Sequence, residues 1–158
     1  MHKQGAELKG IKQVYKCQYF TIKELVSPIV YKQWGEKAWM FFDPYLLEDL
    51  DYGRESYGAP IIINNWANGG SLKQCGLRSN LDEIPKSKTQ QGLLYLSAHT
   101  MGCGFDLHCG FGHHQKLYNH WEELIKRKKF KRFKRLENFN KTKTWVHSDS
   151  FQSSTITF

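Results

Sequence analysis

A stretch of ten residues, 97–106, constrains this chain more than any other. It carries a histidine, His99, and a carboxylate, Asp106, with two glycines between them. Neutral imidazole and carboxylate are good zinc ligands, and glycines allow the tight turn that brings such groups together. Two ligands do not close a metal site, so a third must come from elsewhere. The best candidate is His147, near the C-terminus.

The composition is that of one globular domain. The 158 residues are 40% hydrophobic, which suits a single domain with its own core. The formal net charge of +8 favours an anionic partner, either nucleic acid or a polyanionic wall or membrane surface. Charge alone does not choose among these. We find no apolar segment of a secretory signal at the N-terminus, and no stretch long and apolar enough to span a bilayer.

The cysteines indicate free thiols. They do not form Cys-x-x-Cys pairs, so a structural zinc site with four thiolate ligands is not expected. A disulfide framework is not expected either in a chain of this size without a secretory signal. We therefore expect four reduced and mostly buried thiols, at Cys17, Cys75, Cys103 and Cys109.

Three segments are predicted to be helical. The first lies within residues 20–26, where Thr21 and Glu24 have the spacing of a capping box and Pro28 should disturb the helix early. The second spans residues 44–57 and starts after Asp43. The third spans residues 115–128, and its apolar residues share one side: Leu117, Trp121, Leu124 and Ile125.

Short strands are predicted at four places: residues 61–63, residues 105–108, around residue 136, and residues 144–149. Side chains alternate between the two faces of a strand. Asp106 and His108 therefore share a face of the second strand. The same alternation places three residues on one face of the last strand: Trp145, His147 and Asp149.

The segments between these elements are predicted to be loops. Residues 64–80 form a long loop that is rich in Asn and Gly, and a loop of this length in a compact domain is often functional. Residues 82–92 form a second loop, which is polar and exposed. Residues 1–18 form an arm or a short first strand, and residues 150–158 a tail. Because we find no repeat and no linker, we expect residues 1–158 to form a single domain.

The three candidate ligands supply the protein side of a catalytic zinc site, which keeps an open position beside three ligands. A metal in such a site acidifies a bound water and polarises a carbonyl. Spacing alone does not exclude His108 or Cys109 as competing ligands. Since His108 shares the face of Asp106, the alternative is that it contacts a metal ligand without binding the metal itself.

Several short motifs carry a family resemblance. Residues 97–106 have the pattern Ser-x-His-x-x-Gly-x-Gly-x-Asp. This pattern resembles the Ser-x-His-x-x-Gly-x-Ala-x-Asp signature of the zinc DD-carboxypeptidase and hedgehog-like peptidase superfamily. Residues 145–147, Trp-Val-His, are similar to the Trp-(Val/Ile)-His ending of that family, and residues 76–79, Gly-Leu-Arg-Ser, resemble its Gly-Tyr-Arg-Ser turn. Residues 20–25 are like the opening helix of its compact bacterial and bacteriophage members.

The resemblance implies an α+β domain with a small, mainly antiparallel sheet flanked by helices. It also implies one zinc ion, held by His99, Asp106 and His147. The implied activity is that of a zinc metallopeptidase of the lysin type, which hydrolyses amide bonds in peptidoglycan stem peptides as a DD-carboxypeptidase or endopeptidase. Without a signal peptide, such a protein is expected to be made in the cytoplasm and delivered to the cell wall by lysis machinery or as a virion component.

Four further residues are candidates for the site. Arg78 matches the family arginine that binds substrate or the developing oxyanion, a task that suits the fixed donors of a guanidinium. Ser97 either orients the substrate or is a turn residue. Glu137 is the expected general base, which must come within hydrogen-bond reach of the attacking water, or it pairs with nearby basic residues. Asp149 is expected to orient His147 through a hydrogen bond.

One departure from the family pattern favours a non-catalytic alternative. Several members have an acidic residue or a histidine shortly before the final histidine, whereas this chain has Lys141, Thr142, Lys143 and Thr144. A virion or wall-binding protein of the same fold would not need that base, although the retained ligands argue against this alternative.

The basic segment 126–135, with its interleaved Phe residues, raises nucleic-acid binding as another alternative. The same segment could contact anionic wall polymer. We favour stem peptides and wall polymer over nucleic acid as partners.

Overall fold

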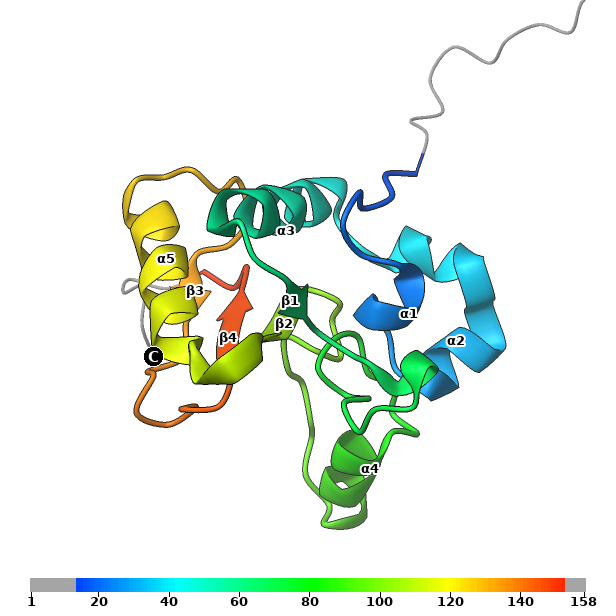
Figure 1. Ribbon diagram of the computed structural model, residues 1–158. Coiled ribbons are helices and arrows are strands. Elements are labelled where there is room, and N and C mark those ends of the chain that lie inside the picture. The colour runs from blue at the N-terminus through cyan, green and yellow to red at the C-terminus, as the bar shows by residue number, and fades with distance from the viewer. Residues whose placement is uncertain (1–13, 153–158) are drawn as a thin grey trace, which may run out of the picture.

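A four-stranded antiparallel sheet lies at the centre of the protein. The computed structural model describes residues 14–152 (Figure 1). In spatial order the strands are β1 (Ile61–Ile62), β2 (Gly104–Cys109), β4 (Val146–Asp149) and β3 (Arg135–Leu136), and each neighbouring pair is antiparallel. Helices surround this sheet, so the expected α+β class with a small antiparallel sheet is confirmed.

Two short helices open the described chain. The first, α1 (Ile22–Leu25), has Thr21 as its N-cap, and the predicted capping box with Glu24 is present. Pro28 does more than disturb this helix, because it starts a second one, α2 (Pro28–Trp34). Proline suits the first turn of a helix, where its missing N–H costs no hydrogen bond. A 3-10 helix, η1 (Gly35–Phe41), follows directly.

The longest helix is α3 (Pro44–Tyr57), which has the predicted limits. The Asp43 side chain accepts a hydrogen bond from the Tyr45 N–H at its start, and Gly58 ends it with a φ of 72°. Residues 14–18 form neither helix nor strand and lie against this helix, where the Tyr15 hydroxyl donates to Asp51. The remainder of the expected N-terminal arm, residues 1–13, and most of the expected tail, residues 153–158, lie outside the described residues.

The prediction of a loop over residues 82–92 is wrong in part. Residues Glu83–Gln90 form a helix, α4, which extends away from the sheet in Figure 1. Its sequence lacks the apolar periodicity of a packed helix, and Pro85 is its buried residue. The prediction that this segment is exposed is therefore largely correct. The helix was not predicted because its sequence has no apolar stripe. A 3-10 helix, η2 (Trp66–Asn68), also lies within the predicted loop of residues 64–80.

The last helix, α5 (His114–Lys126), packs against β2, β4 and α3. A short 3-10 helix, η3 (Gly110–Gly112), leads into it. The apolar side of α5 is buried as predicted: Leu117, Trp121, Leu124 and Ile125. The Trp121 ring lies 5.2 Å from Phe130 and 6.0 Å from Phe133, between ring centroids. These contacts connect α5 to the segment that leads into β3.

That basic segment is held in place by Asp49 of α3. The buried Asp49 carboxylate accepts hydrogen bonds from the backbone N–H groups of Lys131, Arg132 and Phe133. Burial raises the pKa of Asp49, although these three bonds oppose the shift. The predicted loop running into a strand near Leu136 is confirmed.

The cysteines are all free, but the expectation of mostly buried thiols is met only by Cys109, since Cys17, Cys75 and Cys103 are partly exposed. Within residues 14–152, no helix is both long and apolar enough to cross a membrane.

A substitution at Gly53 tests the packing between α3 and α5. A Cβ atom at this position would lie 2.2 Å from Cη2 of Trp121, so the ring would have to move. Alanine normally stabilises a helix relative to glycine by about 0.5–1 kcal/mol, but overpacking a core costs about 1–3 kcal/mol. We expect Gly53→Ala to lower the free energy of unfolding by about 1–2 kcal/mol in urea denaturation.

The matched control is Glu55→Ala, at an exposed position of the same helix, which should change stability by less than about 0.5 kcal/mol. Equal or higher stability of Gly53→Ala would show that α5 does not pack as described.

Candidate metal centre

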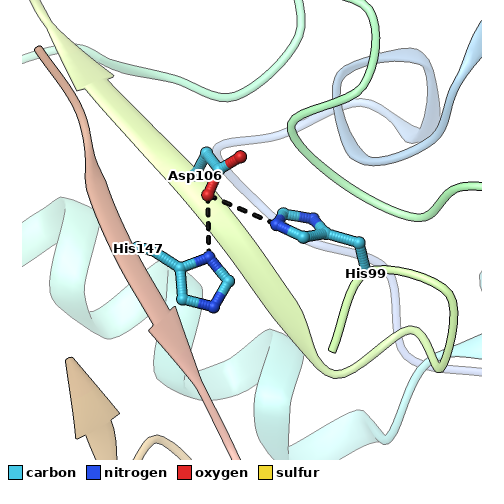
Figure 2. Close-up of side chains that lie close together, drawn as sticks. All are labelled: His99, Asp106 and His147. Carbon is cyan, nitrogen blue, oxygen red and sulfur yellow. Dashed lines mark hydrogen bonds and ion pairs between the residues drawn. The ribbon is translucent and has the colours of Figure 1, made fainter. Parts of the chain in front are cut away.

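The three predicted ligands meet at the middle of the sheet. Ligand atoms of His99, Asp106 and His147 all lie within 4.8 Å of one another. Asp106 comes from β2, His147 from the neighbouring β4, and His99 from the turn before β2. Figure 2 shows both imidazole rings directed at the same carboxylate oxygen of Asp106. The group is largely buried, with His99 5% and His147 8% exposed.

The pairing of β2 with β4 brings two of these residues together. Asp106 is directly opposite His147 in the antiparallel register, and opposite residues of such a pair point to the same face. The other face of β2 belongs to the core, where Phe105 and Leu107 are fully buried. The sheet therefore presents Asp106 and His147 side by side on the face away from these core residues.

Glycines bring His99 to the same place. Gly102 has a φ of 67°, and a Cβ there would lie 3.0 Å from the Phe41 carbonyl oxygen. At Gly104, a Cβ would lie 2.5 Å from the Ala98 Cβ and 3.3 Å from Cε1 of His147. The missing side chain at Gly104 therefore lets the turn approach β4 closely, and Gly102 allows the left-handed backbone beside Phe41, as the two glycines of the sequence motif suggested.

The hydrogen bonds of His99 determine which of its nitrogens can bind a metal. Nδ1 lies 2.9 Å from the carbonyl oxygen of Gly76, and a carbonyl can only accept. Nδ1 must therefore carry the hydrogen, so the lone pair of the neutral ring is on Nε2. That nitrogen lies 3.3 Å from Oδ1 of Asp106. Two acceptors facing each other at this distance favour a cation between them.

His147 has a carboxylate on each side. Its Nδ1 lies 2.7 Å from Oδ1 of Asp106, and its Nε2 lies 3.2 Å from Oδ2 of Asp149. Burial by itself lowers the pKa of His147, but the hydrogen bonds to the two carboxylates outweigh it and raise the pKa to about 9. This pKa favours the protonated ring at neutral pH. A metal ion at Nδ1 would take the place of that proton and leave Nε2–H to donate to Asp149.

Asp106 is the shared anion of the group. Burial raises the pKa of Asp106, yet the hydrogen bond from His147 and the contact with the His99 ring outweigh this effect and hold that pKa below its ordinary value. Its second oxygen, Oδ2, accepts from Nη2 of Arg78 at 3.3 Å. Two imidazoles and one ionised carboxylate, with their lone pairs converging, fit a divalent ion. Histidine nitrogen and carboxylate oxygen are a donor set that zinc accepts.

Arg78 lies beside the ligands, as predicted. Its guanidinium contacts Asp106 and also donates from Nε to the Gln74 carbonyl oxygen. Its backbone N–H donates to the carbonyl oxygen of His99 at 3.1 Å. The side chain is buried, 8% exposed, so its charge faces the site rather than the solvent.

Asp149 has the contact predicted for it, and Arg135 is a residue that the sequence analysis missed. Both oxygens of Asp149 accept from Arg135, at 2.8 Å from Nε and 2.8 Å from Nη2. In the sequence, Arg135 appears only as one of many cations of a basic segment. Its position opposite Asp149 follows from the pairing of β3 with β4, so a correct register would have found it.

Glu137 and Ser97 lie close to the ligands in the chain trace. The Glu137 N–H donates to the carbonyl oxygen of His147 at 3.0 Å, which places Glu137 next to His147 across β3 and β4. The Ser97 hydroxyl accepts from the Thr100 N–H at 3.2 Å and so has the contacts of a turn residue. The roles of Glu137 as a base and of Ser97 toward a substrate stay predictions.

The competing ligands are separate from this centre. His108 shares a face of β2 with Asp106, as predicted, but its Nε2 lies 3.5 Å from Sγ of Cys75. Cys109 is buried opposite Ile61 of β1. Within residues 14–152, His99, Asp106 and His147 are the one group of three or more such side chains with metal-binding proximity.

A pocket of about 290 Å³ opens beside the turn that carries His99. It is bordered by Arg78 and by Thr100 and Met101, which follow His99 directly. The remaining lining is mostly apolar: Val30, Trp34, Phe41, Leu77 and Ser79. Apolar walls with a few polar groups are typical of small-ligand sites. None of the three candidate ligands lines the pocket, so it offers space for a small group beside Arg78 and the turn that carries His99.

Metal binding by purified protein tests this centre. We expect one divalent ion per chain, measured by elemental analysis after removal of loosely bound metal. Losing a group that only supports a ligand costs about 10–100-fold in affinity, so His99→Ala and His147→Ala should each cost more. The control is His113→Ala, at an exposed histidine outside the group. Full metal content in His147→Ala would rule out His147 as a ligand.

The chain matches no family model, no curated protein and no solved structure. The likeness of residues 97–106 and 145–147 to peptidase motifs is thus a likeness of short segments. What the protein does has to be proposed from the contacts of the site.

Proposed function

We propose that the protein is a zinc-dependent peptidase that hydrolyses amide bonds of peptidoglycan stem peptides. The observation that carries this proposal is the convergence of His99 Nε2 and His147 Nδ1 on one oxygen of Asp106. Three protein ligands leave a fourth position of zinc open, as in catalytic rather than structural sites. The choice of peptidoglycan rests on the sequence motifs, and the likeness to hedgehog and DD-peptidase folds belongs to the same proposal.

The bound ion would lower the pKa of water and polarise the scissile carbonyl. The residues of the chain have three tasks around it. The first task, holding the ion, belongs to His99, Asp106 and His147. The contact of His99 with Gly76 and that of His147 with Asp149 keep the two imidazole rings in the required orientation. The other two tasks, accepting a proton and binding the substrate, belong to Glu137 and Arg78.

Glu137 is the proposed general base. It follows β3, in which Leu136 is opposite Ser148, so continued pairing puts Glu137 opposite His147 and on the same face. From that position its carboxylate accepts a proton from the attacking water and returns it to the leaving amine. Its side chain is partly exposed, as a group that exchanges protons with substrate requires.

Arg78 is the proposed group for the substrate. Contacts with Asp106 and Gln74 engage its Nη2 and Nε atoms. A guanidinium has five N–H donors, so Nη1 is the part that can bind a substrate carboxylate or the developing oxyanion. The neighbouring pocket, which Arg78 also borders, provides room for an adjoining part of the peptide. Ser97 would support this side of the site from within the turn that carries His99.

The basic segment supports nucleic-acid binding less than its composition suggested. Five of its eight cationic side chains have a carboxylate partner: Lys126, Arg127, Lys131, Arg132 and Arg135. Each of these cations is partly neutralised by its carboxylate partner, which leaves less positive charge for a phosphate backbone. The net charge of +8 still favours an anionic surface, and we propose that anionic wall polymer is that surface, with delivery by lysis machinery or as part of a virion.

Replacement of the proposed base tests the mechanism. General-base catalysis contributes about 10²–10⁴-fold to a rate, so Glu137→Gln should lower the release of peptide fragments from purified peptidoglycan by a factor in that range. Zinc content should stay unchanged, because Glu137 is not one of the three ligands. The matched control is Glu55→Gln, which makes the same change at an exposed position on α3.

A wild-type protein that holds zinc but releases no fragments would refute the peptidase proposal. It would favour the alternative of a wall-binding or virion protein. One observation supports that alternative: residues 141–144, just before the final ligand, provide no acid or imidazole, and Thr142 among them is buried.

A further inference from the structure

We propose that Arg135 is a positioning residue of the metal centre, which acts through Asp149 on the ligand His147. The inference rests on metal binding by the proposed ligands, but it does not depend on peptide hydrolysis. It concerns a residue that lies in the basic segment and shares no motif with the site.

Asp149 is fully buried and has four donors. Its Oδ1 accepts from Nε of Arg135 at 2.8 Å and from the Phe151 N–H at 2.9 Å. Its Oδ2 accepts from Nη2 of Arg135 at 2.8 Å and lies 3.2 Å from Nε2 of His147. A bidentate contact of this kind fixes the plane of the carboxylate as well as its position. Asp149 is therefore held in one orientation.

This arrangement distinguishes the two carboxylates that flank His147. Both Asp106 and Asp149 contact the ring of His147, one at each nitrogen. Oδ1 of Asp106 faces the two imidazoles and can bind the ion. The oxygens of Asp149 are occupied by Arg135, so this carboxylate serves as an acceptor for Nε2–H. By holding Asp149 in this position, Arg135 supports the tautomer with its hydrogen on Nε2, in which Nδ1 offers its lone pair to the metal.

The sheet and the C-terminal segment hold Arg135 in place. Arg135 is directly opposite Asp149 in the pairing of β3 with β4. Its guanidinium carbon also lies 5.0 Å from the centroid of the Phe151 ring, within the range of a cation–π contact. Removing the guanidinium would leave a buried carboxylate without its main partner, beside a ligand whose orientation depends on it.

The test measures zinc affinity in Arg135 variants by competition with a chromophoric chelator. Arg135→Gln should raise the zinc dissociation constant by about 10–100-fold, the usual effect of removing a group that orients a ligand. Arg135→Lys keeps the charge but loses the two parallel N–H donors of the guanidinium. Its zinc dissociation constant should lie between those of the wild type and Arg135→Gln. With Co²⁺ in place of zinc, the d–d absorption of Arg135→Gln should differ from that of the wild type.

The control for stability is Ser148→Ala. This change removes the hydrogen bond from the Ser148 hydroxyl to the carbonyl oxygen of Arg135, and so loosens the same strand pair without touching the contact with Asp149. A double variant, Arg135→Gln with Asp149→Asn, should recover the thermal stability lost in Arg135→Gln, because no buried charge is left unpaired. Its zinc affinity should stay low.

The outcomes separate this inference from the proposed function. Wild-type zinc affinity in Arg135→Gln, or an equal loss in Ser148→Ala, would overturn the positioning role and leave the peptidase proposal intact. Weakened zinc binding in Arg135→Gln, together with a wild-type protein that cleaves nothing, would support the positioning role and refute the peptidase. A wild-type protein that binds no zinc would overturn both.

Discussion

The antiparallel register between β2 and β4 is the constraint on which the site depends. It places Asp106 opposite His147, and these two residues meet His99 only because Gly104 leaves room beside them. A shift of one residue would turn every side chain of a strand to the other face. The buried residues Phe105 and Leu107 prevent such a shift, because it would expose them to solvent. Core packing thereby fixes the geometry of the polar face.

Charge balance is the second condition of the site. Two carboxylates, Asp106 and Asp149, lie close to His147 in a region with little solvent, and burying charge without a partner is costly. Arg78 contacts the first carboxylate and Arg135 the second. Each arginine therefore balances the charge of one carboxylate that contacts His147. The same two carboxylates stabilise the protonated ring of His147 and raise its pKa to about 9.

The sequence predicted most of the packed elements and the three side chains that meet in the candidate metal centre. Helix α3 was predictable because proline, an aspartate cap and spaced leucines all agreed with one another, and α5 because its apolar residues share one side. The glycines at positions 102 and 104 indicated a close turn, which the structure explains by contacts with Phe41, Ala98 and His147. Helix α4 was missed because it is solvated and has no apolar stripe to reveal it.

By itself, the sequence determined which side chains can serve as ligands, since only certain residue types donate to a metal and they stand out against their neighbours. Tertiary structure alone decided how each one is used. The tautomer of His99 depends on the Gly76 carbonyl, 23 residues away in the chain. His147 contacts Asp149, and Asp149 in turn accepts from Arg135. These partners come from strand pairing and loop packing. Because local sequence does not encode such long-range contacts, they emerged only once the chain was folded.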